Sequence, residues 1–168
     1  DDSLINIAVT YYADTPVTPQ QMLAHYYHAR IKQNAKAYPE ALYAALHAEA
    51  AALQLNDHYH LGLIYRLMME CDYYHRVEER LKYAQLSYDH FALTENKRHI
   101  NYARLHVAIS FTANRKMEHS VEILNPLLKV AETENDSAFL SHVLSSYSNA
   151  LMCMDNYASA KELLLQLQ

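Results

Sequence analysis

The chain has 168 residues, a mass of 19.4 kDa and 51% hydrophobic residues, so it is long enough for one domain with a sizeable core and too apolar to be disordered. One glycine and four prolines leave too little turn chemistry for the hairpins of a sheet protein, which predicts an all-α fold. A net charge of -5 without a basic block argues against nucleic acid as a partner of this segment, and no apolar run reaches the roughly 20 residues of a membrane-spanning helix.

Apolar residues recur at spacings of three and four, the period of a helix with one buried face. Polar caps and prolines mark helix starts at Thr18-Pro19, Pro39, Asn56-Asp57, Asp136-Ser137 and Asp155-Asn156. We therefore expect about nine helices, joined by short turns and antiparallel to their neighbours. Their expected ranges are 3–13, 19–34, 39–54, 57–72, 76–93, 97–114, 117–133, 136–154 and 157–168. Pro126 lies inside one of these ranges and should kink or split its helix, because it removes a backbone hydrogen bond.

The helices should form pairs, because the second helix of three pairs opens with one pattern. The segments YPEALYAAL (38–46), MEHSVEILN (117–125) and YASAKELLL (157–165) each place a small residue three positions after a large apolar one. These small residues are Ala41, Ser120 and Ala160, and in the remaining pair the equivalent is either Arg80 or Ala84. The first helix of each pair carries another small residue, in order Ala29, Gly62, Ala108 and Ser148. Such self-similarity predicts a helical repeat protein.

The stretch LGLIY, with Leu61, Gly62 and Tyr65, resembles the Leu-Gly-x-x-Tyr of the first helix of the tetratricopeptide repeat (TPR). Helices of such repeats approach too closely for a large side chain, so the only glycine is interpreted as a packing device. The resemblance implies an α-α superhelix, a TPR-like solenoid of antiparallel helix pairs. The repeat spacings of 33, 46 and 40 residues depart from the usual value of about 34.

The resemblance also implies the domain organisation. Residues 1–168 would form a single TPR-like domain, in which 19–168 make four helix pairs and 1–18 carry the second helix of a truncated pair. We expect the chain to be a fragment of a longer protein, or one that covers its apolar helical ends by self-association, because repeat arrays normally end in a polar capping helix.

Two segments, DSLINIAVTYY and NDHYHLGLIYRL, are similar to TPR segments of Bacteroidota proteins in which such arrays precede a membrane helix and a histidine-kinase or helix-turn-helix output. This likeness implies a bacterial signalling protein, a sensor or transcriptional regulator. It also implies a periplasmic domain of a membrane-anchored protein, with a cytoplasmic location as the alternative; the segment itself does not encode its compartment.

In a TPR array, the outward edge of each first helix lines a concave groove. Carrying that edge over gives Leu23, Tyr26, Arg30, Gln33 and Asn34 in the first pair, and Tyr59, Leu63, Arg66 and Leu67 in the second. The third pair gives Tyr102, Leu105, Ile109 and Thr112, and the fourth gives His142, Ser145, Asn149 and Met152. Tyrosine and arginine are enriched in protein-binding surfaces, so Tyr26, Tyr59 and Tyr102 are predicted to form a binding stripe.

The resemblance therefore predicts a protein- or peptide-binding or sensing module. Arg30 and Arg66 could clamp a carboxylate. One alternative is that the tyrosine stripe only packs against its own protein. Another is a structural scaffold or homo-oligomerisation module that uses the apolar helical ends.

The sequence predicts neither an enzyme nor a cofactor site. It lacks a nucleophile motif and a glycine-rich phosphate loop. The close histidine pairs His25/His28 and His58/His60 have no accompanying metal-ligand motif, so we expect no metal site and interpret them as surface or interface residues.

Other residues are assigned to the interior. Cys71 and Cys153 lie in apolar helical segments and are predicted to be two buried thiols. Tyr38, Tyr65 and Tyr157 occupy positions where the repeat buries an aromatic ring between helices.

Overall fold

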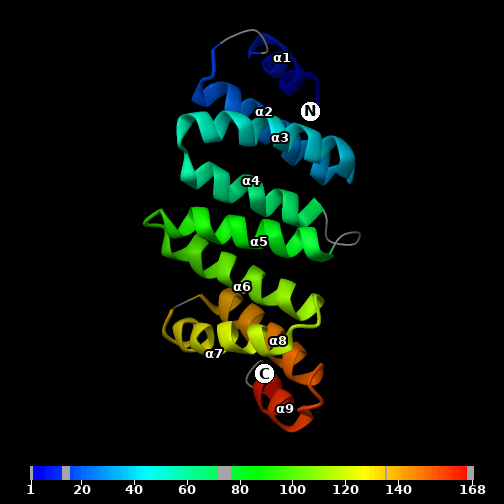
Figure 1. Ribbon diagram of the computed structural model, residues 1–168, viewed down its shortest axis with the longest axis vertical. Helices are drawn as coiled ribbons and strands as arrows, with labels where there is room; N and C mark the ends of the chain where they lie inside the picture. Colours follow the sequence, from blue (N-terminus) through cyan, green and yellow to red (C-terminus); the bar gives the residue numbers. More distant parts are fainter. Residues whose placement is uncertain (1, 13–15, 72–76, 135, 166–168) are drawn as a thin grey trace. The chain divides into compact units, whose positions relative to one another are not determined.

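The computed structural model describes residues 2–12, 16–71, 77–134 and 136–165, which form nine helices and no strand (Figure 1). The helices are α1 (Asp2–Tyr12), α2 (Pro19–Asn34), α3 (Tyr38–Leu55), α4 (His58–Cys71), α5 (Val77–Ala92), α6 (Lys97–Ala113), α7 (Met117–Thr133), α8 (Ser137–Met152) and α9 (Tyr157–Leu165). Each predicted helix is confirmed, with its ends within about two residues of those expected. Residues 13, 72, 76 and 166–168 of the predicted ranges lie outside the described residues.

The chain divides into two compact units, residues 1–95 and 96–168. In the first unit α2 packs against α3 and α4 against α5, and α1 rests on α2. In the second unit α6 packs against α7 and α8 against α9. Within each unit the first helices of successive pairs also touch, α2 with α4 and α6 with α8. Helix pairing is as predicted; that both units act as one domain stays a prediction.

Short polar side chains cap the helices where the sequence places them. The Thr18 hydroxyl oxygen accepts the backbone N–H of Gln21 at 3.2 Å, at the start of α2. The Asp136 carboxylate accepts the N–H of Phe139 at 3.0 Å, at the start of α8. Each cap satisfies a backbone donor that a helix start leaves without a partner, which fixes where the helix begins.

Three pairs share one turn between their two helices. Two or three residues beyond the end of the first helix, the chain adopts a left-handed conformation at Lys36 (φ 59°), Arg115 (φ 57°) and Asp155 (φ 58°). The next residue donates its N–H to a carbonyl five residues back, from Ala37 to Lys32 (2.9 Å), Lys116 to Phe111 (3.0 Å) and Asn156 to Leu151 (2.9 Å). This is the Schellman motif, in which glycine is the usual left-handed residue. Its recurrence supports the repeat independently of the sequence pattern.

We expect an Arg115→Gly variant to be more stable than the natural chain, by about 0.5 to 1 kcal/mol. Arg115 is exposed and left-handed, so glycine removes a steric penalty without opening the core. Urea unfolding would measure the change. The exposed Lys129 in α7 provides the control, because Lys129→Gly should destabilise by about 1 kcal/mol. Equal losses in both variants would contradict the strain at Arg115.

The small residues of the repeat lie between closely packed helices. Ala29, Ala108 and Ser148 are completely buried, and Gly62 is buried too. In the second helices, Ala41 and Ser120 are completely buried and Ala160 is 2% exposed. The predicted burial of these small residues is confirmed, and at Gly62 an added Cβ atom would lie 2.7 Å from the Phe91 ring.

The structure describes α5 from Val77 onward and shows both residues that the sequence left as alternatives for the small position. Arg80 is 7% exposed, and Ala84, one turn later, is completely buried. Both alternatives left by the sequence therefore face the interior.

Two local predictions differ from the structure, and of the kink or split expected at Pro126 only the split is excluded. Cys71 is buried as expected, but Cys153 is exposed, because it caps the end of α8 beyond the last buried turn. Tyr157 is 62% exposed at the start of α9, and no later helix in the described residues covers it. Pro126 does not split α7, which runs from Met117 to Thr133. The proline is exposed, so the backbone carbonyl left without its helical partner can be hydrated.

Candidate functional site

The predicted groove residues of α2 and α4 lie together in the first unit. The side-chain amide of Gln33 donates to the Glu70 carboxylate at 2.7 Å. Arg66 Nε lies 3.7 Å from the other oxygen of the same carboxylate. The sequence prediction missed Glu70, although its place one turn after Arg66 is the usual spacing of a helical ion pair.

Tyr26 lies beneath this surface and is largely buried. Its side chain is 8% exposed and belongs to the hydrophobic core of the first unit. Burial raises the pKa of its phenol, while the nearby cations Arg30 and Arg66 act in the opposite direction. Tyr26 therefore remains neutral and offers little accessible surface to a ligand.

The two arginines beside Tyr26 differ in their partners. Arg30 is half-buried and forms no hydrogen bond or ion pair within the described part of the chain. The Arg66 side chain is 27% exposed, and its Nε makes no hydrogen bond, because Glu70 lies beyond hydrogen-bond distance. Both guanidinium groups thus keep capacity to bind an incoming anion.

The remaining predicted groove residues of this unit range from exposed to completely buried. Asn34 is exposed and Leu63 is half-buried against the core, as is Leu23. Tyr59 is 36% exposed, and its ring meets Phe91 of α5 edge-on with ring centroids 6.1 Å apart. Leu67 is completely buried, so its assignment to the groove was wrong. It lies on the side of α4 that fills the core.

The second unit has an equivalent surface formed by α6 and α8. Tyr102 packs on Phe139 with ring centroids 4.8 Å apart and meets His142 edge-on at 6.3 Å. The Arg98 guanidinium lies 5.7 Å from the Tyr102 ring, within the range of a cation–π contact. The four α8 residues assigned to the groove are all exposed: His142, Ser145, Asn149 and Met152.

Three α6 residues are less accessible than predicted. Leu105 is 1% exposed and does not line a groove, which corrects its assignment. Ile109 is half-buried against the core of the second unit. The Thr112 hydroxyl lies 2.8 Å from the Ser120 hydroxyl of α7, so this side chain binds within its own helix pair. The proposed tyrosine stripe spans both units, and its continuity stays a prediction.

Histidines form contacts that the sequence did not predict. The rings of His58 and His90 stack with centroids 5.2 Å apart, and their Nδ1 atoms lie 3.0 Å apart. His25 and His47 stack similarly, with centroids 5.1 Å apart. Such pairs join α2 to α3 and α4 to α5. In the part of the chain that the structure describes, no three His, Cys, Asp or Glu side chains gather closely enough to hold a metal ion.

These pairs predict that the protein loses stability as the pH falls from about 7 to 5. Burial and the neighbouring histidines lower the pKa of His25 below 6.5, and burial and His58 do the same for His90. The unfolded chain therefore binds more protons in this range, so stability rises with pH. We expect urea unfolding of a variant with both His25→Gln and His90→Gln to show a weaker pH dependence, whereas His142→Gln should match the natural chain. Parallel profiles for all three proteins would contradict the assignment.

None of the helices in the described ranges combines the length and hydropathy needed to cross a bilayer.

Comparison with known proteins is informative at the level of structure. No protein-family model and no curated protein match the chain. The structure resembles the nearly identical TPR-like repeats of a protein described as a kinesin light chain from Podosopora anserina, with a TM-score of 0.81 and 17% identity over 99% of this chain and 83% of that chain. It also resembles BtubC (BKLC) from P. vanneervenii, with a TM-score of 0.87 and 10% identity over 99% of this chain and 70% of that chain. By fold the chain is therefore an all-α, TPR-like solenoid of antiparallel helix pairs. This confirms the fold implied by the resemblance of the stretch LGLIY to a TPR.

Proposed function

We propose that the chain is a non-catalytic module that binds a peptide or protein segment on the α2/α4 surface of its first unit. The observation that carries this proposal is the pair of cations beside Tyr26, with Arg30 uncommitted and Arg66 loosely held by Glu70. TPR-like arrays commonly use the concave side of their first helices for binding, so the fold supports the same location.

The chemistry of this surface favours an acidic segment. An arginine without a carboxylate partner offers several N–H donors in a planar fork that matches a carboxylate. A ligand carboxylate can bind Arg30 directly and compete with Glu70 for Arg66. Gln33 already holds Glu70, which would steady that carboxylate when Arg66 turns to the ligand. Asn34, exposed at the end of α2, would lie along the same path.

The α6/α8 surface of the second unit is a separate candidate for binding. His142 and Asn149 are exposed on α8, and Tyr102 lies beside His142. We further propose that the module serves a bacterial regulatory or sensing protein, on the strength of its resemblance to Bacteroidota TPR segments.

A structural scaffold is the second candidate, and a specific observation favours it. Leu4, Ile7 and Tyr11 of α1 are 70%, 66% and 72% exposed and share one face of the helix. Leu165 of α9 is 54% exposed. Large exposed apolar side chains in a row mark an association surface more often than a solvated one.

Selection from a displayed random-peptide library would test the two functions. The natural chain should enrich peptides with acidic residues, and a variant carrying Arg30→Ala and Arg66→Ala should lose them. Enrichment of apolar peptides that both proteins bind equally would favour the scaffold and contradict the α2/α4 site.

A further inference from the structure

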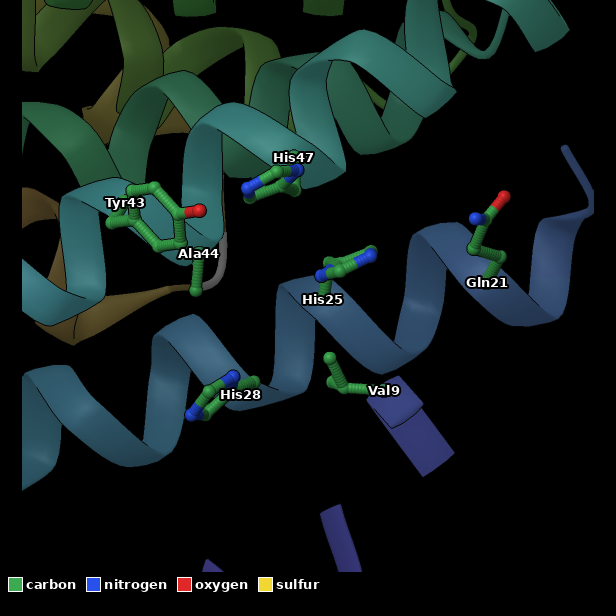
Figure 2. Close-up of a pocket in the computed structure, with 7 residues that line it drawn as sticks. All are labelled: Val9, Gln21, His25, His28, Tyr43, Ala44 and His47. Carbon is green, nitrogen blue, oxygen red and sulfur yellow. The ribbon is translucent and has the colours of Figure 1, made fainter. Parts of the chain in front are cut away.

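A cavity of about 330 Å³ opens among α1, α2 and α3, with walls that include none of the α2/α4 residues discussed above. It is lined by Val9 of α1, by Gln21, His25 and His28 of α2, and by Tyr43 and His47 of α3. Figure 2 shows the rings of His25 and His47 facing each other between α2 and α3, with Val9 on the α1 side. The volume lies at the lower end of the range for small-molecule sites.

The lining favours a ligand of one charge type. It contains no carboxylate and no permanent cation, but three imidazoles and a phenol. The His25 and His47 rings are close to parallel, at 22°, and Tyr43 meets the His47 ring edge-on at 4.7 Å. Protonated imidazoles and a phenol are hydrogen-bond donors, so the wall can present donors to an anion.

Without a ligand, the cavity resists protonation. The groups that act on His25 are His47 of α3 and His28 of its own helix, both of which would become cations, and α1 contributes the uncharged Val9. Together with burial they lower the pKa of His25. An anion held beside the His25 ring would reverse this effect, because its charge offsets that of the imidazolium.

Gln21 adds an independent polar feature. Its amide N–H donates to the carbonyl of Tyr12 at 2.9 Å, which fixes the orientation of the side chain. Its carbonyl oxygen is buried and has no hydrogen-bond donor within the described residues. Gln21 precedes His25 by one helical turn, so this acceptor lies on the helix face that lines the cavity.

We propose that this cavity binds a small organic carboxylate beside the stacked imidazoles of His25 and His47, and that each anion binds together with one proton from solvent. The added proton resides on the His25 imidazole and pairs with the single negative charge. A monovalent carboxylate matches this single uptake, whereas a dianion would require two adjacent imidazolium ions. The apolar part of the ligand would pack on Val9.

Calorimetric titration with benzoate tests the proposal, with benzamide as the uncharged molecule of the same shape. Benzoate should bind at pH 5.5, and its dissociation constant should rise by about tenfold per pH unit above the pKa of His25. The binding heat should differ between buffers of different ionisation enthalpy by the amount for one proton. Benzamide should bind at least tenfold more weakly than benzoate.

Variants separate this cavity from other histidines. His47 is exposed, so His47→Gln should fold normally and weaken benzoate binding at least tenfold, while His119→Gln, at an exposed position of α7 in the second unit, should leave it unchanged. The proton resonances of the His25 ring provide a second readout in the natural chain, since benzoate should shift their titration to higher pH. Absence of benzoate binding at pH 5.5, equal affinity for benzamide, a pH-independent dissociation constant, or normal binding by His47→Gln would each overturn the proposal.

Discussion

A Gly62→Leu variant should lose about 3 kcal/mol of unfolding free energy, because no space exists for a side chain at this point of α4. A Cβ atom on Gly62 would lie 2.7 Å from ring carbons of Phe91, closer than real Cβ contacts. Phe91 is 1% exposed and cannot swing away without displacing its neighbours. The Ser87 hydroxyl donates to the Gly62 carbonyl at 2.8 Å, which further ties α5 to this turn of α4.

The smaller change Gly62→Ala separates the effect of crowding against Phe91 from the higher helix propensity of alanine. In a free helical position this change would stabilise by about 1 kcal/mol, whereas overpacking against Phe91 costs about 1 to 3 kcal/mol. The exposed Ala50 of α3 supplies the reference, because Ala50→Gly reports helix preference alone. Phe91→Leu should relieve part of the loss in a double-mutant cycle. The measurement is urea unfolding. If Gly62→Ala stabilises the protein, α4 and α5 can pack together without a glycine at this position.

Replacing Arg30 and Arg66 together by alanine should weaken binding of an acidic peptide by roughly 10- to 100-fold, the usual effect of losing charge-assisted hydrogen bonds. Glu70→Gln should act in the opposite direction and tighten binding severalfold. The reason is that Arg66 then has no competing carboxylate, while Gln33 keeps a polar partner. Fluorescence anisotropy with a peptide from the library selection would measure both changes.

The matched control for charge is Lys129→Ala, which removes an exposed cation from α7 in the second unit. This variant should bind the peptide as the natural chain does. If Lys129→Ala weakens binding as much as Arg66→Ala, the attraction is a general effect of net charge and not recognition by the α2/α4 surface.

The helices and their pairing were predictable because the signals that set them are local. Thr18 and Asp136 accept backbone N–H groups within the next turn, so a short stretch of sequence is enough to fix where a helix starts. Small residues at equivalent positions of the repeats, such as Gly62 and Ala29, indicate close helix packing. Even the wide spacing between repeats did not obscure this pattern.

The candidate sites were only partly predictable, because they depend on rotation of each helix and on contacts between helices. Leu67 and Leu105 lie within one helical turn of exposed positions. A small rotation of the helix about its axis is enough to place such a residue in the core, where both are found. Glu70 could have been found from its spacing to Arg66. The stack of His25 on His47 joins two helices, and no spacing along one helix specifies it.

The most direct test of the proposed function is where a bound peptide lies on the molecule. Cross-saturation NMR with a selected acidic peptide should map the contact to the exposed or half-buried residues of the α2/α4 surface, among them Arg30, Asn34 and Arg66. A contact that maps instead to the exposed apolar face of α1, at Leu4, Ile7 and Tyr11, would contradict peptide recognition by this surface and support the scaffold.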